Sequence, residues 1–399
     1  MTGARVGSAL SDEQRAVREL VREFALEEVR PVARETDAEE SFPEEVWDGL
    51  AELGLTGLTV PEEYGGFDAD RTTYAVVNEE LAYGALAVAT ALSVHCLVTS
   101  CLAEFGSDTQ RERWLPEMAD GRPVGMFCLS EPQAGSNPAE MSTTARYDPD
   151  HDEYVLNGTK QWITNGERGG VAVVFAKAIE GETDGDTDSA HPEANRDAIT
   201  QFLVPADTAG FEVGPKEEKL GLRASDTTSI TFDGCRIPAE NRLTEVGDGL
   251  SAAFRILTGG RIGIAAQAVG LAQAAFDEAR EYAGEREQFG RAIAEIDAIR
   301  GTFAEMATEI AASRLLVREA CRRAEAGESA RVAAAQAKLS ASETAMSVTN
   351  EAVQIHGGYG YTTAFDVERL YRDAKITEIY EGTSEIQKKI IARGVLDDR

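Results

Sequence analysis

The sequence predicts an α+β multidomain protein in which a helical domain, a β domain and a second helical domain follow one another. The chain has 399 residues, more than one ordinary hydrophobic core accommodates. Its first and last parts have apolar residues at helical spacing, whereas the middle part has short β-rich runs separated by Gly, Asp and Pro. Separate blocks of helices and strands indicate separate domains and not alternating βαβ units. We place the domains at residues 1–122, 123–241 and 242–399.

The N-terminal domain is expected to be helical from about residue 10. Apolar residues recur three and four positions apart from Arg15 to Val32 and from Thr73 to Leu86. Proline lacks a backbone N–H and clashes with the preceding helical turn. We therefore expect the helices to be interrupted at four prolines: Pro31, Pro43, Pro61 and Pro116.

The middle domain contains four runs rich in β-branched and aromatic residues. We expect these runs to be strands: Tyr154–Leu156, Val171–Phe175, Thr200–Val204 and Ser229–Phe232. The segment Glu180–Asp197 lies between two of them, is acidic and is almost free of apolar residues. Such a segment cannot contribute to a core, so we expect a long exposed loop.

The C-terminal domain is rich in Ala, Glu and Arg at helical spacing, with few helix breakers before Gly357. At its start, Gly247–Ala252 matches the G-x-G-x-x-A pattern of dinucleotide-binding turns. That pattern functions only between a strand and a helix of a βαβ unit. Here Pro238–Arg242 precedes the glycines and helices follow, so we interpret them as a domain junction.

Composition favours a soluble cytoplasmic protein without a metal site. No apolar run approaches the roughly 18 residues of a membrane span, and Met1–Leu10 lacks the pattern of a secretory signal. The five cysteines form no Cys-x-x-Cys pair, and the four histidines are scattered. We expect reduced, mostly buried thiols and no bound metal.

The net charge of −31 excludes nucleic acid and anionic membranes as natural partners. Acidic residues occur in every segment and are not gathered in one tail. A solvated acidic surface is relieved of self-repulsion by molar salt. We therefore expect adaptation to a salt-rich, halophilic cytoplasm.

The segment Ile379–Gln387 (IYEGTSEIQ) is the most informative in the chain, and it allows two interpretations. A carboxylate held among apolar neighbours, as at Glu381, has a raised pKa and can act as a general base near neutral pH. Equally, Thr383 or Ser384 is a typical N-cap, so the segment can be a helix entrance. Local chemistry alone leaves both interpretations open.

This segment resembles the catalytic motif of the acyl-CoA dehydrogenases. Six further segments resemble that family, in the same order and at similar spacing along nearly the whole chain. They are Pro61–Gly66, Met126–Ser136, Gln161–Gly166, Lys219–Ser225, Arg286–Gly290 and Gln354–Gly360.

The resemblance implies a β-barrel or sandwich between the two helical domains, and a four-helix bundle in the C-terminal domain. It implies FAD-dependent α,β-dehydrogenation of an acyl-CoA, with electrons passed to an electron-transfer flavoprotein. It also implies a homotetramer, because two of the segments reach the flavin of a neighbouring subunit in the family. A short- or medium-chain, butyryl-CoA dehydrogenase-like enzyme is our expectation, with branched substrates as an alternative.

By resemblance, Glu381 is the base that takes the α-proton, and Tyr380 and Gly382 shape the substrate pocket. Relatives that carry the base elsewhere place it immediately before the arginine that corresponds to Arg261. That position is Gly260 here, which leaves Glu381 as the base. Arg261 then lies near the carboxylate and substrate; the alternative is a cation on a helix surface.

Sixteen residues are expected by resemblance to contact FAD, and Ser136 is also expected to touch CoA. Without the resemblance, Trp162 would be interpreted as a core aromatic residue. The expected contacts are Phe127, Leu129, Ser130, Gly135, Ser136, Trp162, Ile163, Thr164, Arg286, Gln288, Phe289, Gln354, Gly357, Gly358, Thr383 and Glu385.

Two other functions remain as alternatives. A glutaryl-CoA-type decarboxylating enzyme needs an arginine to bind the distal carboxylate, and the corresponding residue here is Ala89. A non-catalytic acyl-CoA- or flavin-binding relative is expected to have lost the base, and Glu381 is present. Departures from the family pattern at Asn137 and Ile296–Asp297 remove no catalytic group, whereas Thr258 replaces an aspartate that contributes to the CoA contact in the family.

Overall fold

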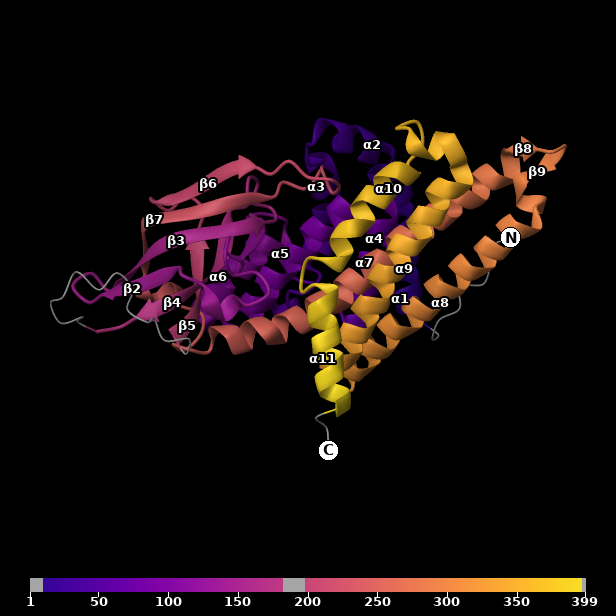
Figure 1. The fold of residues 1–399 in the computed structure, drawn as a ribbon. Coiled ribbons are helices and arrows are strands. Elements are labelled where there is room, and N and C mark those ends of the chain that lie inside the picture. The colour runs from indigo at the N-terminus through magenta and orange to yellow at the C-terminus, as the bar shows by residue number, and fades with distance from the viewer. Residues whose placement is uncertain (1–9, 182–197, 397–399) are drawn as a thin grey trace.

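A computed structural model describes residues 10–181 and 198–396 of the chain. Most of the expected loop Glu180–Asp197 and most of Met1–Leu10 therefore lie outside the described residues. Figure 1 shows the sheet at one end of the molecule, long helices at the other and the N-terminal helices between them. The predicted order of a helical, a β and a second helical part is confirmed.

The N-terminal part consists of helices, as predicted. Arg15–Val32 lies in a helical stretch that continues past Pro31, because a π-helical turn at Ala25–Val29 precedes the proline. Pro116 lies inside a helix, so the expected interruption there is wrong. The helices are α1 (Asp12–Phe24), α2 (Arg30–Glu39), α3 (Glu44–Glu52), α4 (Arg71–Gly84), α5 (Leu86–Phe105) and α6 (Asp108–Ala119).

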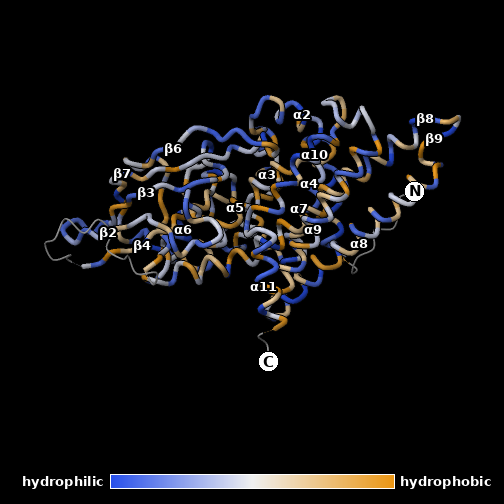
Figure 2. The backbone as a smooth tube through the Cα atoms, viewed as in Figure 1, coloured by the Kyte–Doolittle hydropathy of each residue, from blue (hydrophilic) through white to orange (hydrophobic). Residues whose placement is uncertain are grey.

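Helix α5 corrects one expectation from composition. It is 20 residues long with a mean hydropathy of 1.9, so by length and composition alone it is able to cross a membrane. However, 83% of that apolar window is buried inside the protein. We therefore interpret α5 as a core helix, and Figure 2 shows it in the interior, between the sheet and the C-terminal helices.

The described residues of the middle part form one seven-stranded sheet. Strands β1 and β2 both pair in parallel with one edge of β4, β1 with its first half and β2 with its second half. Strand β5 pairs antiparallel with the other edge of β4. On the far side of β2, the antiparallel strands β3, β7 and β6 follow in that order. The four predicted runs lie in β3, β4, β5 and β7, whereas β1, β2 and β6 were not predicted. The strands are β1 (Gly125–Cys128), β2 (Thr144–Asp148), β3 (Glu153–Ile163), β4 (Val171–Ile179), β5 (Ile199–Pro205), β6 (Phe211–Lys216) and β7 (Thr228–Pro238).

Three long and two shorter helices make up the C-terminal part. A small hairpin interrupts it between α7 and α8, which the sequence did not indicate. The Gly247–Ala252 segment begins α7 and follows a strand that pairs only antiparallel, so it is outside any βαβ unit, as predicted. The elements are α7 (Gly249–Glu285), β8 (Glu287–Gln288), β9 (Arg291–Ala292), α8 (Asp297–Glu325), α9 (Arg331–His356), α10 (Val367–Ala374) and α11 (Ser384–Leu396).

Close contact between α4 and α7 joins the N-terminal and C-terminal helices into one hydrophobic core. At Gly270 of α7, a Cβ atom would overlap the backbone oxygen of Glu79 in α4. The approach therefore requires glycine. All five cysteines are buried and unpaired, as predicted.

Gly270 and Gly284, both in α7, form a matched pair for testing this contact. Gly270→Ala is expected to lower the free energy of unfolding by about 1–3 kcal/mol, because the added methyl group overpacks the α4–α7 contact. Gly284→Ala is expected to raise it by about 0.5–1 kcal/mol, because no atom lies within 4 Å and Ala favours the helix. Urea unfolding followed by circular dichroism measures both; equal losses would contradict the contact as the cause.

Candidate active site

Glu381 lies in a tight turn immediately before α11. The backbone φ angles of Glu381 and Gly382 are +50° and +99°. This left-handed conformation is unfavourable for Glu381 by about 1–2 kcal/mol, because Glu381, unlike glycine, has a side chain. Helix α11 begins at Ser384, and Thr383 Oγ1 accepts a hydrogen bond from Ile386 N at 3.4 Å. The segment is thus a helix entrance and also presents a carboxylate, so the two interpretations of the sequence are compatible.

The Glu381 carboxylate packs directly over Gly260 in α7. A Cβ atom at Gly260 would overlap Glu381 Oε2 and would lie 3.2 Å from Leu97 Cδ2. The carboxylate therefore occupies the space that any side chain at residue 260 would need. Oε2 is buried and has no hydrogen-bond partner among the described residues.

Burial raises the pKa of Glu381 to about 7, although the positive charges of Lys338 and Arg261 oppose this effect. A carboxylate with this pKa is partly ionised at neutral pH and is suited to general base catalysis. Arg261 is 5% exposed, which excludes its interpretation as a surface cation. Burial lowers the pKa of Arg261, and the nearby Glu381 charge acts in the opposite direction.

The side chain of Tyr380 is fixed on the core side of the turn. Its hydroxyl donates to Gln267 Oε1 at 3.1 Å, and Gln267 Nε2 donates to Asn78 Oδ1 at 2.7 Å. Burial raises the pKa of Tyr380, so the phenol stays protonated and able to donate. The turn therefore cannot rotate without breaking this buried chain of hydrogen bonds.

Two side chains beside Glu381 were not predicted. Lys338 Nζ in α9 and Gln387 Nε2 in α11 both donate to the carbonyl oxygen of Gly382, at 2.6 and 2.7 Å. Neither residue is exposed. A signal for Lys338 existed in the sequence: it shares a helix face with buried alanines such as Ala334 and Ala341, where a solvated lysine would not fit.

The first two expected flavin-binding segments lie side by side. Gln161 N donates to Ser130 O at 2.9 Å. Lys160 Nζ donates to Glu131 Oε1 at 2.8 Å and to Leu129 O at 3.3 Å, and both charged side chains are fully buried. Although burial opposes it, the Lys160 charge lowers the pKa of Glu131 to about 2. This ion pair was not predicted, and no local pattern indicates it.

The residues of these segments differ in exposure. Trp162 is 61% exposed with a φ of +62°, so its interpretation as a core aromatic is wrong. The side chain of Ile163 lies in the core of the sheet, which leaves its backbone to face a ligand. Ser136 is exposed, and a Cβ atom at Gly135 would meet nothing within 4 Å. Phe127 and Leu129 are partly buried between the sheet and α5.

A second group of expected flavin contacts lies at the far end of α7. Arg286 lies 5.9 Å from the ring centroid of Tyr359, which joins the hairpin to the segment after α9. Figure 1 shows this end of the bundle pointing away from the sheet. Arg286 is 25 positions beyond Arg261 in one helix, about 38 Å along its axis. Six of the expected FAD contacts therefore lie far from Glu381 in the same chain: Arg286, Gln288, Phe289, Gln354, Gly357 and Gly358. Two others, Thr383 and Glu385, lie beside it.

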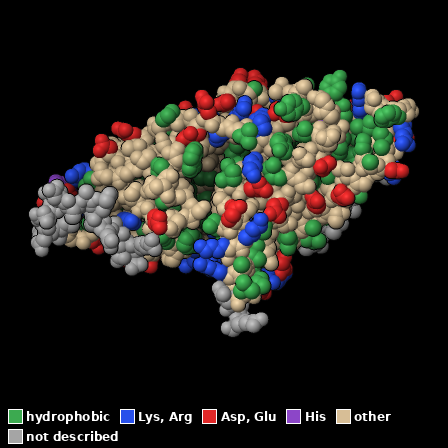
Figure 3. All heavy atoms as spheres, viewed as in Figure 1, with side chains coloured by type: hydrophobic (Ala, Val, Ile, Leu, Met, Phe, Trp, Pro, Cys, Tyr) green, Lys and Arg blue, Asp and Glu red, His purple; other side chains and the backbone are tan. Residues whose placement is uncertain are grey.

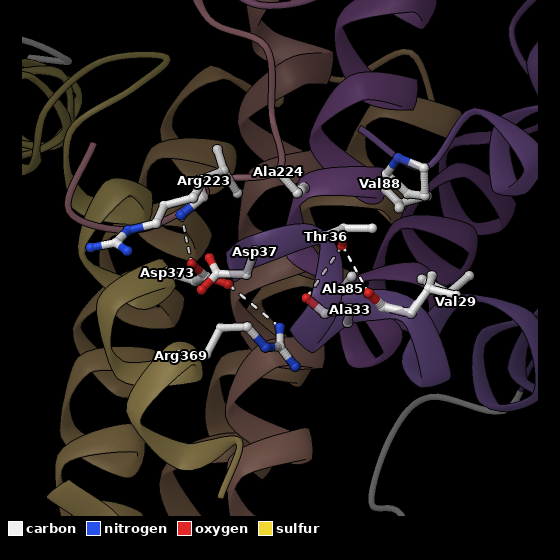
Figure 4. A pocket seen from close by; sticks show the side chains of 14 residues that line it. Val29, Ala33, Thr36, Asp37, Ala85, Val88, Arg223, Ala224, Arg369 and Asp373 are labelled. Carbon is white, nitrogen blue, oxygen red and sulfur yellow. Dashed lines mark hydrogen bonds and ion pairs between the residues drawn. The ribbon is translucent and has the colours of Figure 1, made fainter. Parts of the chain in front are cut away.

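The Lys219–Ser225 segment has a structural role in this arrangement. Leu222 N donates to Asp373 Oδ1 in α10 at 2.6 Å, and Arg369 Nη1 lies 3.6 Å from Asp373 Oδ2. Figure 4 shows Asp37, Arg369 and Asp373 converging on a small cavity between α2, α10 and this segment. Burial raises the pKa of Asp373 to about 6. Among the described residues, no group of three or more His, Cys, Asp or Glu side chains is arranged to hold a metal ion.

Three family models match the chain in order. They are the N-terminal, middle and C-terminal domains of acyl-CoA dehydrogenase, and they match residues 11–122, 126–235 and 247–396. Acryloyl-CoA reductase (NADH) of Anaerotignum propionicum is 42% identical over 392 residues, which cover 98% of this chain and 96% of that protein.

Two solved structures are similar over nearly the whole chain. Butyryl-CoA dehydrogenase from Megasphaera elsdenii has a TM-score of 0.91 and 38% identity, covering 97% of this chain and 99% of that one. A structure described as the electron transferring flavoprotein of Acidaminococcus fermentans has a TM-score of 0.92 and 37% identity, covering 98% and 100%. With the fold and the site described above, these matches show that the chain belongs to the acyl-CoA dehydrogenase family of flavin-dependent oxidoreductases, whose members use FAD.

Proposed function

We propose that this enzyme oxidises a short, straight-chain acyl-CoA to the trans-2-enoyl-CoA, with Glu381 as the base. The observation that carries the proposal is the Glu381 carboxylate, desolvated over Gly260 and with a pKa of about 7. A thioester acidifies its α-carbon, so a carboxylate of this pKa is able to take the α-proton. Arg261 and Lys338 favour the ionised form that accepts the proton.

The residues near Glu381 have separate tasks in this proposal. The backbone N–H of Glu381 donates to the thioester oxygen and stabilises the negative charge that develops there. Tyr380, held by Gln267, and Gly382 form the pocket wall beside the α-carbon. FAD, when bound, supplies the acceptor for the β-hydride.

Several features of the first two segments fit a flavin. Trp162 presents an exposed ring on a left-handed backbone, and Gly135 leaves open space where a Cβ atom would be. Ser130 and Thr164 provide hydroxyl groups beside them. We assign Phe127, Leu129, Ser130, Gly135, Ser136, Trp162, Ile163, Thr164, Thr383 and Glu385 to FAD of the same chain, and Ser136, Arg261, Tyr380 and Gly382 to the substrate.

We assign the distant group at the end of α7 to FAD of a second chain. About 38 Å of rigid helix separates Arg286 from Arg261, so one flavin cannot contact both ends of α7. The exposed ring of Phe289, at 93%, is also typical of a surface that a ligand or subunit covers. In a homotetramer, the FAD of a neighbouring subunit would then be bound by six residues of this chain: Arg286, Gln288, Phe289, Gln354, Gly357 and Gly358.

The similar proteins support a short acyl chain. Their names specify butyryl-CoA and acryloyl-CoA, which have four and three acyl carbons. A glutaryl-type reaction is disfavoured because Ala89 is buried in the core and provides no cation for a distal carboxylate. The similarity to a structure described as an electron transferring flavoprotein supports such a protein as electron acceptor. The reductase name makes NADH-linked reduction of an enoyl-CoA the second candidate.

We also propose that the acidic surface is an adaptation to a salt-rich cytoplasm. The chain has 70 acidic and 39 basic residues. Figure 3 shows acidic side chains distributed over the visible face, above both the sheet and the helices. Molar salt shortens the range of their repulsion to about 3 Å.

Replacing the base tests the proposed reaction. In anaerobic titrations, butyryl-CoA is expected to bleach the flavin of the native protein faster than octanoyl-, isobutyryl- or glutaryl-CoA. Glu381→Gln is expected to slow bleaching by about 10²–10⁴-fold, because Gln cannot accept the proton. The native kcat/KM is expected to rise as pH increases through about 7, because only ionised Glu381 is active.

Glu343→Gln, which changes an exposed carboxylate in α9, is the control for these titrations. Bleaching of Glu381→Gln at the native rate would contradict the proposed base. Native protein that binds the thioesters without bleaching would instead indicate a non-catalytic binding protein.

Lys160→Met tests the assignment of the first two segments to FAD. The variant leaves the Glu131 carboxylate buried without its cation, which is expected to destabilise the folded state by about 3–5 kcal/mol. FAD content after purification is expected to fall, because Leu129 and Glu131 lose their bonds from Lys160 of β3. Lys177→Met in strand β4 of the same sheet is the control. A variant with a lower Tm and full FAD content would contradict the assignment.

The assembly and salt proposals are tested on the same protein sample in molar KCl. Light scattering in molar KCl is expected to give the mass of four chains, and Tm is expected to fall on dialysis into low salt, because repulsion among acidic side chains is no longer screened. A Tm that does not depend on salt would contradict the adaptation. A monomer with full FAD content would contradict the shared flavin site.

A further inference from the structure

A buried lysine of α9, Lys338, lies beside Glu381 but outside the segments that resemble the family, so the resemblance gives it no role. Lys338 is fully buried, and within the described residues its hydrogen-bond acceptor is the backbone carbonyl of Gly382, not a carboxylate. A buried ammonium group bonded only to a neutral carbonyl is costly unless an anion lies nearby. The carboxylate beside it is that of Glu381, one residue before the carbonyl.

The bond from Lys338 also fixes the backbone on which the base depends. Glu381 and Gly382 both have positive φ, so the peptide between them is turned away from the course of a regular helix or strand. Two donors from different helices, Lys338 and Gln387, hold the oxygen of Gly382 in this orientation. Because one anchor comes from α9 and the other from α11, rotation of the turn would break both bonds at once.

The groups that face Glu381 come from three helices, and two of these groups are charged. Arg261 faces it from α7 and Lys338 from α9, while Tyr74 in α4 is a neutral phenol whose pKa the Glu381 charge raises. The Lys338 ammonium has the larger influence of the two cations on Glu381, and it is also near Glu378 and Glu385. Burial lowers the pKa of Lys338 to about 8, so it is still protonated at neutral pH.

We propose that Lys338 is a positioning residue: with Gln387 it clamps the carbonyl of Gly382, holds Glu381 in its left-handed conformation over Gly260, and by its charge favours the ionised form of the carboxylate. This inference rests on the proposed role of Glu381 as the base. It assigns Lys338 no contact with substrate or FAD. Its two components, a tether and a charge, are separable because Gln387 contributes only the tether.

Lys338→Met removes both components, and Gln387→Leu removes one tether without changing a charge. Lys338→Met is expected to slow flavin bleaching by butyryl-CoA at least tenfold at pH 7 while the thioester Kd changes less than twofold. The acid limb of its kcat/KM profile is expected to move up by about one pH unit, because the lost cation had lowered the pKa of Glu381. Gln387→Leu is expected to slow bleaching without moving this limb. Lys388→Met, which removes an exposed ammonium group from α11, is the control.

A folded Lys338→Met protein with full FAD content and an unmoved acid limb would overturn the inference. If that variant does not fold, Lys338→Arg tests the inference, because it retains the positive charge but not the geometry of the bond to Gly382. Flavin bleaching is then expected to be slower, with the acid limb of the kcat/KM profile unchanged. Native kinetics would contradict the role of Lys338 as a tether.

Infrared titration without acyl-CoA distinguishes this inference from the proposed reaction. The infrared band of the protonated Glu381 carboxyl group is identified by its absence from Glu381→Gln. This band is expected to titrate near pH 7 in the native protein and at a higher pH in Lys338→Met. This result is expected even if no thioester bleaches the flavin. Equal titration in both proteins would overturn the effect of the Lys338 charge.

Discussion

The burial of one carboxylate determines most of the structure around this site. Removing Glu381 from water disfavours its charged form, and two buried cations in α7 and α9 reduce this cost without eliminating it. The result is a carboxyl group close to its midpoint of ionisation at neutral pH. Buried charges of this kind need rigid surroundings, because small displacements change their solvation. The all-helical core around α4, α7 and α9 provides that rigidity.

The fold could be predicted from the sequence where local patterns repeat over several turns or strands. Helical spacing located the N-terminal helices, and runs such as Val171–Phe175 located the central strands. Strand β1 escaped prediction because Gly125–Cys128 is short and contains a glycine and no β-branched residue. The break between α7 and α8 escaped because Glu287–Ala292 forms a hairpin whose strands are two residues long. Both elements depend on tertiary contacts more than on local preference.

The site was predicted as far as its residues lie in contiguous segments. Glu381 and Arg261 were predicted to lie near each other, and the structure places their charged groups close together in the protein interior. Lys338 and Gln387 were not found, because their connection to Glu381 passes through a backbone oxygen, and no side-chain pattern encodes such a bond. The ion pair between Glu131 and Lys160 joins positions 29 residues apart, a distance at which sequence spacing carries no information.

The contact between Gly260 and Glu381 also limits how such an enzyme can evolve. A side chain at residue 260 would occupy the space that holds the end of the Glu381 side chain, so it requires that carboxylate to move. An ancestor with glutamate at both positions would suffer a steric clash and repulsion between like charges. A change in the position of the base therefore involves both residues, because a side chain gained at residue 260 displaces the carboxylate at residue 381.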